Sequence, residues 1–194
     1  GVGRIVLVDD DRVEESDLNR QLLHWASDLG RPKVESAAEK LRRLNPEVFV
    51  EARLERLRQL DRALELVRGG DIAIDCLDNW GSRFLLNEAC VRAGKPLVHA
   101  AVEGSAGWLT VLKPPEGPCL RCLFSKPPHE RTSIPVAGPL PGVFGSMEAF
   151  ESLKLLTGFG KPLVGRMLFV DLASWVIEVV DARRRPDCPV HRAQ

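Results

Sequence analysis

Acidic and basic side chains follow the first apolar run of the sequence. Ile5-Val6-Leu7-Val8 stops at Asp9-Asp10-Asp11, a pattern typical of a buried parallel strand that ends at the carboxyl edge of a sheet. Ligands bind at that edge in open α/β sheets, where an acidic residue can accept hydrogen bonds from ribose hydroxyls. Arg20 adds a planar cation suited to phosphate oxygens. These residues indicate a nucleotide site, although a capped strand followed by a solvated, charged loop explains them equally.

A second cation and a further carboxylate suit the phosphates of the same ligand. Lys33 opens a helix predicted from the apolar spacing of residues 34–44, where a cation opposes the helix dipole and gains from a nearby anion. Asp78 follows a second strand-like run, a position suited to holding Mg²⁺ beside a triphosphate. A solvated lysine is the alternative for Lys33, and capping of the next helix is a sufficient reason for Asn79.

Cysteine and histidine stand at metal-ligand spacing in two places. Cys119 and Cys122 are three positions apart, and so are Cys188 and His191. Three thiolates and one imidazole fill a tetrahedral zinc site and leave no position for water, which predicts a structural zinc clasp. Two unrelated, reduced pairs are the alternative.

The other cysteines and one histidine are expected in the core. Cys76 and Cys90 are interpreted as small buried hydrophobic residues, as unpaired cysteines usually are. His99 lies in a strand predicted over residues 96–101, and we interpret it as a hydrogen-bonded core histidine rather than a catalyst.

The composition of the 194 residues is that of an ordinary soluble globular protein. Lys+Arg and Asp+Glu are equal at 27 each, so no bulk charge attracts nucleic acid or an anionic membrane. No apolar run approaches the ~20 residues of a transmembrane helix, and no export signal opens the chain. An odd number of cysteines, five, then favours a cytoplasmic protein with reduced or metal-bound thiols.

The pattern of elements predicts an α/β fold, with a Rossmann-like nucleotide-binding sheet continued by antiparallel strands and a zinc clasp. The glycine-rich turn of such folds normally precedes the ribose acid by about 20 residues. Asp9 lies too near the start for that, so the first strand and its turn are expected to be missing from this chain. One domain is predicted over residues 1–194, with a nucleotide-binding half to residue 117 and a zinc-clasped half from residue 118.

Further elements follow from periodicity and turn residues. Strands are expected over residues 48–52 and 108–112, helices over residues 57–67 and 142–156, and a hairpin from residues 168–171 and 176–180. A helix is also expected to end at Gly94. The Pro-rich loop over residues 126–141 is long enough to be functional.

Together these segments resemble the ThiF, MoeB and HesA family of enzymes that activate ubiquitin-like proteins. The matching segments, in chain order, are Leu7-Val8-Asp9, Asp17-Leu18-Asn19-Arg20-Gln21, Pro32-Lys33-Val34-Glu35-Ser36, Asp75-Cys76-Leu77-Asp78-Asn79, Cys119-Leu120-Arg121-Cys122, Gly142-Val143-Phe144-Gly145-Ser146-Met147-Glu148-Ala149 and Leu155-Leu156-Thr157-Gly158. They cover nearly the whole chain in the family's order, which makes the resemblance specific.

The resemblance implies ATP-dependent adenylation of the C-terminal glycine of a ubiquitin-like sulfur carrier protein, followed by sulfur transfer from a donor protein. The implied site residues are Asp9 for the ribose, Arg20 and Lys33 for the phosphates, Asp78 for Mg²⁺, and Asp11 and Asn79 as further nucleotide contacts. The family also implies a homodimer in which one subunit lends an arginine to the other's ATP site. The loop between the two metal pairs would lie over the tail of the carrier.

Three differences from the family pattern bear on function. The glycine-rich turn and the lent arginine would precede residue 1, so this chain by itself is expected to bind ATP poorly. Asp17 stands where many relatives carry Asn, and its carboxylate would repel a triphosphate unless Mg²⁺ or Arg20 compensates. The loop at residues 132–135 lacks the cysteine with which many relatives capture the carrier, so no thioester is predicted there.

Two other functions fit the same residues. One is a non-catalytic, dimeric carrier-binding module that has lost its phosphate loop. The other is an ATP-driven dehydratase of the same family acting on a tRNA base, which the balanced charge of the chain disfavours.

Overall fold

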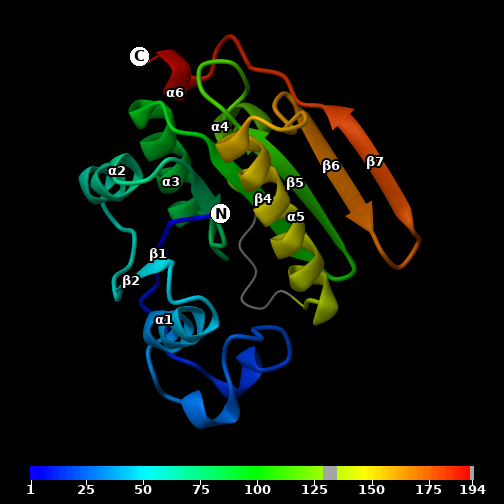
Figure 1. The fold of residues 1–194 in the computed structure, drawn as a ribbon. Helices are drawn as coiled ribbons and strands as arrows, with labels where there is room; N and C mark the ends of the chain where they lie inside the picture. Colours follow the sequence, from blue (N-terminus) through cyan, green and yellow to red (C-terminus); the bar gives the residue numbers. More distant parts are fainter. Residues whose placement is uncertain (129–134, 193–194) are drawn as a thin grey trace. The chain divides into compact units, whose positions relative to one another are not determined.

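The chain forms two compact units, Gly1–Arg56 and Leu57–Gln194 (Figure 1). The computed structural model describes residues 1–128 and 135–192. Helices and strands alternate along much of these ranges, which confirms the predicted α/β class. No helix within them has both the length and the apolar character needed to cross a membrane.

The first unit contains a two-stranded parallel sheet and one long helix. β1 (Arg4–Val8) pairs in parallel with β2 (Phe49–Arg53). Between them the chain forms two short 3-10 helices, η1 (Glu15–Asp17) and η2 (Ala26–Asp28), and then α1 (Lys33–Leu44). α1 buries the first part of its predicted apolar stripe, Val34, Ala37 and Ala38, together with Ser36, whereas Leu44 at its end is exposed. The carboxyl end of β1 therefore leads directly into the acidic segment expected to bind a nucleotide.

The second unit is built on a five-stranded sheet in the order β3-β4-β5-β6-β7. β3 (Ala73–Asp75) and β4 (Leu97–Glu103) are parallel. β5 (Ala106–Leu112), β6 (Arg166–Asp171) and β7 (Val176–Asp181) continue the sheet antiparallel. The predicted antiparallel continuation and the hairpin of β6 and β7 are thus confirmed.

Five helices complete the described part of this unit. They are α2 (Leu60–Arg68), α3 (Trp80–Ala93), α4 (Leu120–Leu123), α5 (Pro139–Thr157) and α6 (Pro189–Arg192). α3 ends at Gly94, whose left-handed φ of 65° suits a residue without a side chain. α5 begins three residues before its predicted start, because the run Pro139–Gly142 joins the first turn, where proline is tolerated.

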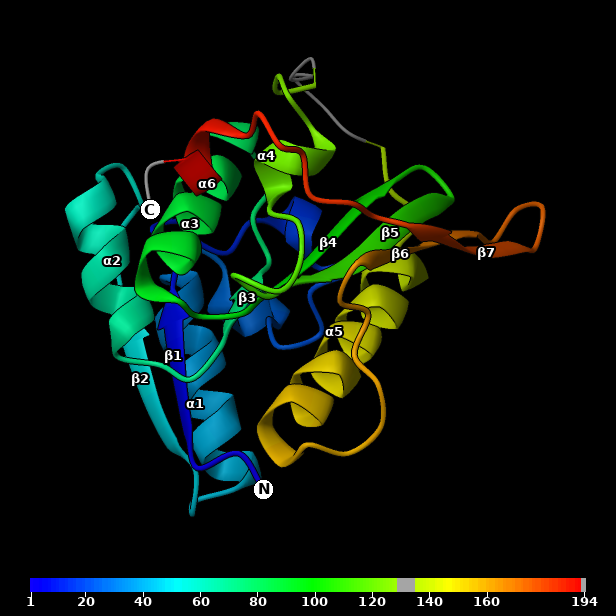
Figure 2. The same ribbon diagram turned by 90° about the horizontal axis from the view of Figure 1, so that it is seen from above.

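Alternating residues of the central strands pack against helices on opposite faces of the sheet. Leu97 and Leu112 join the core formed with α2 and α3. Val98 and Val111 join the core formed with α5, which runs along the other face of β4 and β5 (Figure 2). This two-sided burial explains why the strands read as nearly continuous apolar runs.

One close contact fixes α5 against the sheet. A side-chain carbon added at Gly107 of β5 would lie 2.7 Å from the ring of Phe144, a buried residue of α5. Gly107 is therefore required to admit the aromatic ring at this crossing.

The predicted core residues outside the metal pairs divide into two groups. Cys90 and His99 are buried, as expected. Cys76 is exposed, which corrects the expectation that it is a buried hydrophobic residue. The reason is local, since β3 ends at Asp75 and Cys76 already belongs to the loop that follows.

Candidate functional site

The acidic segment after β1 is folded back on itself. The Asp11 amide donates a 2.8 Å hydrogen bond to Oδ1 of Asp9, and the Asp9 amide donates to the carbonyl of Arg53 on β2. Carboxylate oxygens of Asp9, Asp10 and Asp11 lie within 4.8 Å of one another. Partial burial raises the pKa of Asp9, against the hydrogen bond from the Asp11 amide, and the neighbouring carboxylate of Asp11 raises it further. An acceptor for hydroxyl donors is therefore fixed at the end of the strand.

Both predicted phosphate ligands of the first unit meet at Asp17. The Nζ atom of Lys33 lies 3.3 Å from Asp17 and 3.4 Å from Asp11, and Nη2 of Arg20 lies 3.6 Å from Asp17. Burial acts to lower the pKa of Lys33, but the carboxylates of Asp17 and Asp11 outweigh it and raise the pKa overall. Asp17 is itself buried and accepts a hydrogen bond from the amide of Glu14. Its charge is thus compensated by the two cations expected to bind phosphate.

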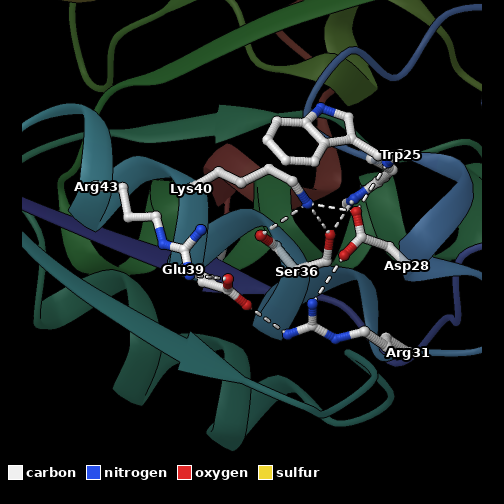
Figure 3. A network of polar contacts seen from close by, with 8 residues as sticks. Trp25, Asp28, Arg31, Ser36, Glu39, Lys40 and Arg43 are labelled. Atoms are coloured by element: carbon white, nitrogen blue, oxygen red, sulfur yellow. Dashed lines mark hydrogen bonds and ion pairs between the residues drawn. The ribbon is translucent and has the colours of Figure 1, made fainter.

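A second buried carboxylate, not recognised from the sequence, ties the loop after β1 to α1. Asp28 accepts hydrogen bonds from Lys40 at 2.5 Å, Arg31 at 2.8 Å and the Trp25 amide at 2.8 Å (Figure 3). Lys40 also donates to Ser36 on α1 and lies over the Trp25 ring. The hydrogen bond from Lys40 holds the pKa of Asp28 at about 2, against the effect of burial. This network fixes the loop that leads into Lys33.

Asp78 and Asn79 belong to the second unit and lie between β3 and α3. Asp78 is exposed, and its Oδ1 accepts a 3.2 Å hydrogen bond from Nδ2 of Asn79. Oδ1 of Asn79 accepts a 2.9 Å hydrogen bond from the Ser82 amide, so Asn79 is the N-cap of α3. The capping interpretation of Asn79 is confirmed, and the same residue also contacts Asp78.

The four predicted metal ligands come together as a buried cluster. Ligand atoms of Cys119, Cys122, Cys188 and His191 lie within 4.8 Å of one another. The Sγ atom of Cys119 is 3.9 Å from that of Cys122 and 3.6 Å from that of Cys188. Both ring nitrogens of His191 are buried without a hydrogen-bond partner in residues 1–128 and 135–192. Buried nitrogens of this kind need a partner, so the cluster has the composition and spacing of a metal site.

Comparison with known proteins assigns the chain to a family. The ThiF family matches residues 1–190. This chain is a member of the ThiF family. It is 45% identical over 198 residues to the SAMP-activating enzyme E1 of Haloferax volcanii, a match that spans 98% of this chain and 72% of that protein. It is 44% identical over 201 residues to the sulfur carrier protein adenylyltransferase of Thermus thermophilus, spanning 98% of this chain and 73% of the relative.

The ThiF assignment agrees with the fold of solved structures. The structure of E. coli MccB with ATP superposes with a TM-score of 0.84 at 22% identity, covering 98% of this chain and 59% of the MccB chain. At this identity the likeness concerns the fold alone. This ThiF chain thus spans about three fifths of the MccB chain, and 42% of the mouse adenylyltransferase and sulfurtransferase MOCS3, to which it is 45% identical.

Within this ThiF chain, the sequence analysis did not predict the burial of the carboxyl groups of Asp28, Asp75 and Glu148. Asp75 and Glu148 lie inside the segments that carry the family resemblance, which was the available signal. Asp28 had no local signal, because its main partner, Lys40, is twelve positions away on α1. The Thr132–Pro135 segment, where no thioester was predicted, lies largely outside the described residues.

Proposed function

We propose that this chain adenylates the C-terminal glycine carboxylate of a ubiquitin-like sulfur carrier protein with ATP. The observation that carries the proposal is the meeting of Arg20 and Lys33 at Asp17, beside the acidic end of β1. Two cations next to a fixed acidic acceptor form a set suited to a nucleotide with its phosphates. The sulfur carrier adenylyltransferase among the relatives supports the choice of reaction.

The proposed reaction transfers an adenylyl group. An oxygen of the carrier's carboxylate attacks the α-phosphorus of ATP, the bond from that phosphorus to the bridging oxygen breaks, and pyrophosphate leaves with the bonding electrons. Arg20 and Lys33 neutralise charge that develops on the phosphate oxygens, while Asp9 and Asp11 orient the nucleotide. Positioning and charge neutralisation supply most of the catalysis in such transfers.

Asp78 is proposed to hold Mg²⁺. An exposed carboxylate is a suitable oxygen ligand for this ion, which commonly binds through one or two carboxylates, substrate phosphates and water. Bound Mg²⁺ supplies charge neutralisation to the triphosphate. Asn79, which donates a hydrogen bond to Asp78, stays a proposed nucleotide contact of the same site.

The Cys119, Cys122, Cys188 and His191 cluster is proposed to hold structural zinc. Zinc 2.3 Å from each of two tetrahedral sulfur ligands places the sulfurs about 3.8 Å apart. The two sulfur distances given above bracket that value. With four protein ligands the ion has no open position, so its contribution is to join α6 to α4 rather than to act on substrate.

A homodimer and a sulfur donor protein complete the proposal, both on the grounds of family membership. In this arrangement the partner subunit lends an arginine to the ATP site. Sedimentation of the protein with its natural start would test the dimer, and a single species at the monomer mass would refute it.

The experiment that tests the function is ATP–pyrophosphate exchange, on protein with its natural start, with and without a carrier ending in Gly-Gly. We expect carrier-dependent exchange that Asp78→Ala lowers by about a hundredfold or more. Asp61→Ala, at an exposed position of α2, is the matched control and should leave exchange unchanged. Carrier binding without exchange would instead support a non-catalytic binding module, and exchange unaffected by Asp78→Ala would refute the site.

A further inference from the structure

The loop that carries Asp78 is held from both sides by the side chains of the buried Asp75 and the partly buried Arg83. The amide of Leu77 donates a 3.0 Å hydrogen bond to Oδ1 of Asp75. The carbonyl of Leu77 accepts from Nε of Arg83 at 3.0 Å and also from its Nη2. Both backbone polar groups of the residue before Asp78 are therefore bonded to side chains, and the residue after it, Asn79, caps α3. The direction in which Asp78 points depends on these contacts.

Asp75 is in turn held by His99. The Nδ1 atom of His99 lies 2.7 Å from Oδ2 of Asp75, and neither side chain is exposed at all. Arg83 is a permanent cation whose Nε atom lies 3.7 Å from Oδ1 of Asp75. A carboxylate this deeply buried is costly unless each oxygen has a donor. His99 supplies the donor for the oxygen that Leu77 and Arg83 do not reach.

Trp108 fixes the tautomer of His99. Its Nε1–H can only donate, and it points at Nε2 of His99 from 3.4 Å. Nε2 is therefore the acceptor nitrogen, and the ring proton sits on Nδ1, where it is donated to Asp75. The chain of hydrogen bonds runs from Trp108 through His99 and Asp75 to the amide of Leu77.

We propose that His99 is a positioning residue for the Asp78 carboxylate, acting through Asp75 and the Leu77 amide. The inference rests on the proposed role of Asp78 in holding Mg²⁺. The His99 side chain is fully buried, so it is not proposed to contact nucleotide or metal, and no step of the proposed transfer uses its proton. Its function is to keep the Asp75 carboxyl group oriented, so that the loop after β3 presents Asp78 in one direction.

Two amide substitutions separate the roles of the two ring nitrogens. The carboxamide nitrogen of His99→Asn takes the place of Nδ1 and can still donate to Asp75, whereas that of His99→Gln reaches the position of Nε2 and cannot. Thr110→Val is the matched control, because Thr110 lies directly opposite His99 on β5 and is equally buried. Its hydroxyl donates to the carbonyl of Arg166, which lies on β6 and not in the Asp78 loop.

Two readouts are measured on the full chain with its natural start. The first is hydrogen exchange of the Leu77 amide without nucleotide, which does not depend on activity. The second is the Mg²⁺ concentration for half-maximal ATP–pyrophosphate exchange, which a loss of folded protein does not shift. Loss of one hydrogen bond to a charged group corresponds to about a tenfold change in each. We expect that change in His99→Gln, and less than about a threefold change in His99→Asn and Thr110→Val.

Several results would overturn the proposal. One is wild-type behaviour of His99→Gln in both readouts. Another is a change in both readouts for His99→Asn as large as that for His99→Gln. If His99→Gln does not fold, a tenfold change in both readouts for His99→Asn alone overturns the proposal. A change in Thr110→Val as large as that in His99→Gln would mean general loosening of the sheet. Hydrogen exchange of the Leu77 amide could change as expected while Asp78→Ala leaves ATP–pyrophosphate exchange unchanged. That result would support the contacts that position the loop but refute the proposed role of Asp78.

Discussion

Glu148 is a buried carboxyl group on α5, and Glu148→Gln tests whether it is neutral in the folded protein. Oε1 of Glu148 has no hydrogen-bond partner among the described residues. Burial raises its pKa to about 8, and the charge of Asp75 adds to the effect. Arg83 and a hydrogen bond from the Ala100 amide act in the opposite direction but are weaker. Glutamine has nearly the same shape and removes the proton equilibrium.

The magnitude and sign follow from linkage. The ordinary pKa of glutamate is 4.5, so between pH 4.5 and about pH 8 the folded state holds a proton that the unfolded state has released. The free energy of unfolding of the wild type therefore falls as pH rises through this window and levels off above it. Since one pKa unit corresponds to about 1.4 kcal/mol, the penalty at pH 8 is roughly 4 kcal/mol. Glu148→Gln should remove it.

The assay is urea unfolding of both proteins at pH 5, 6.5 and 8. We expect nearly equal free energies of unfolding at pH 5 and an advantage of a few kcal/mol for Glu148→Gln at pH 8. Glu151→Gln on the same helix is the matched contrast. Glu151 is also buried, but it pairs with Lys154 and accepts a 2.8 Å hydrogen bond from the Leu163 amide. Its replacement by Gln should therefore lower the free energy of unfolding at pH 8. A pH-independent difference between wild type and Glu148→Gln would refute the reasoning.

Three further predictions concern the first unit and the metal cluster. Asp17→Asn should free Lys33 from its internal partner and tighten ATP binding about three- to tenfold in a calorimetric titration; weaker binding would contradict the compensation argument. Lys40→Met should lower the free energy of unfolding, measured in urea, by about 1–3 kcal/mol, because it removes the main donor to the buried Asp28. An unchanged midpoint of urea unfolding would show that this network does not stabilise the fold. Cys188→Ser should reduce bound zinc well below one equivalent per chain and lower the melting temperature, and full occupancy by metal analysis would exclude Cys188 as a ligand.

The sequence by itself determined the features that depend on neighbouring residues. Apolar runs that end in carboxylates predicted β1 and β3, and the position of Asn79 before an apolar helix predicted its capping bond. The spacing of the two metal pairs, three positions each, predicted a cluster that the structure assembles from α4 and α6. Such signals can be read locally because a strand, a cap or a short ligand pair is set by residues a few positions apart.

Only the tertiary structure decided how the charges are paired. The sequence predicted that Lys33 binds an anion of the ligand, but the fold also places the Asp17 carboxylate 3.3 Å from its Nζ atom. His99 was recognised as a core residue, yet its bond to Asp75 joins residues 24 positions apart. Glu148 lies in a segment that carries the family resemblance, but only the structure shows that its Oε1 atom is buried without a hydrogen-bond partner among the described residues. Whether a charged side chain contacts water or another charge depends on how segments distant in the sequence pack together. Local sequence patterns therefore cannot predict it.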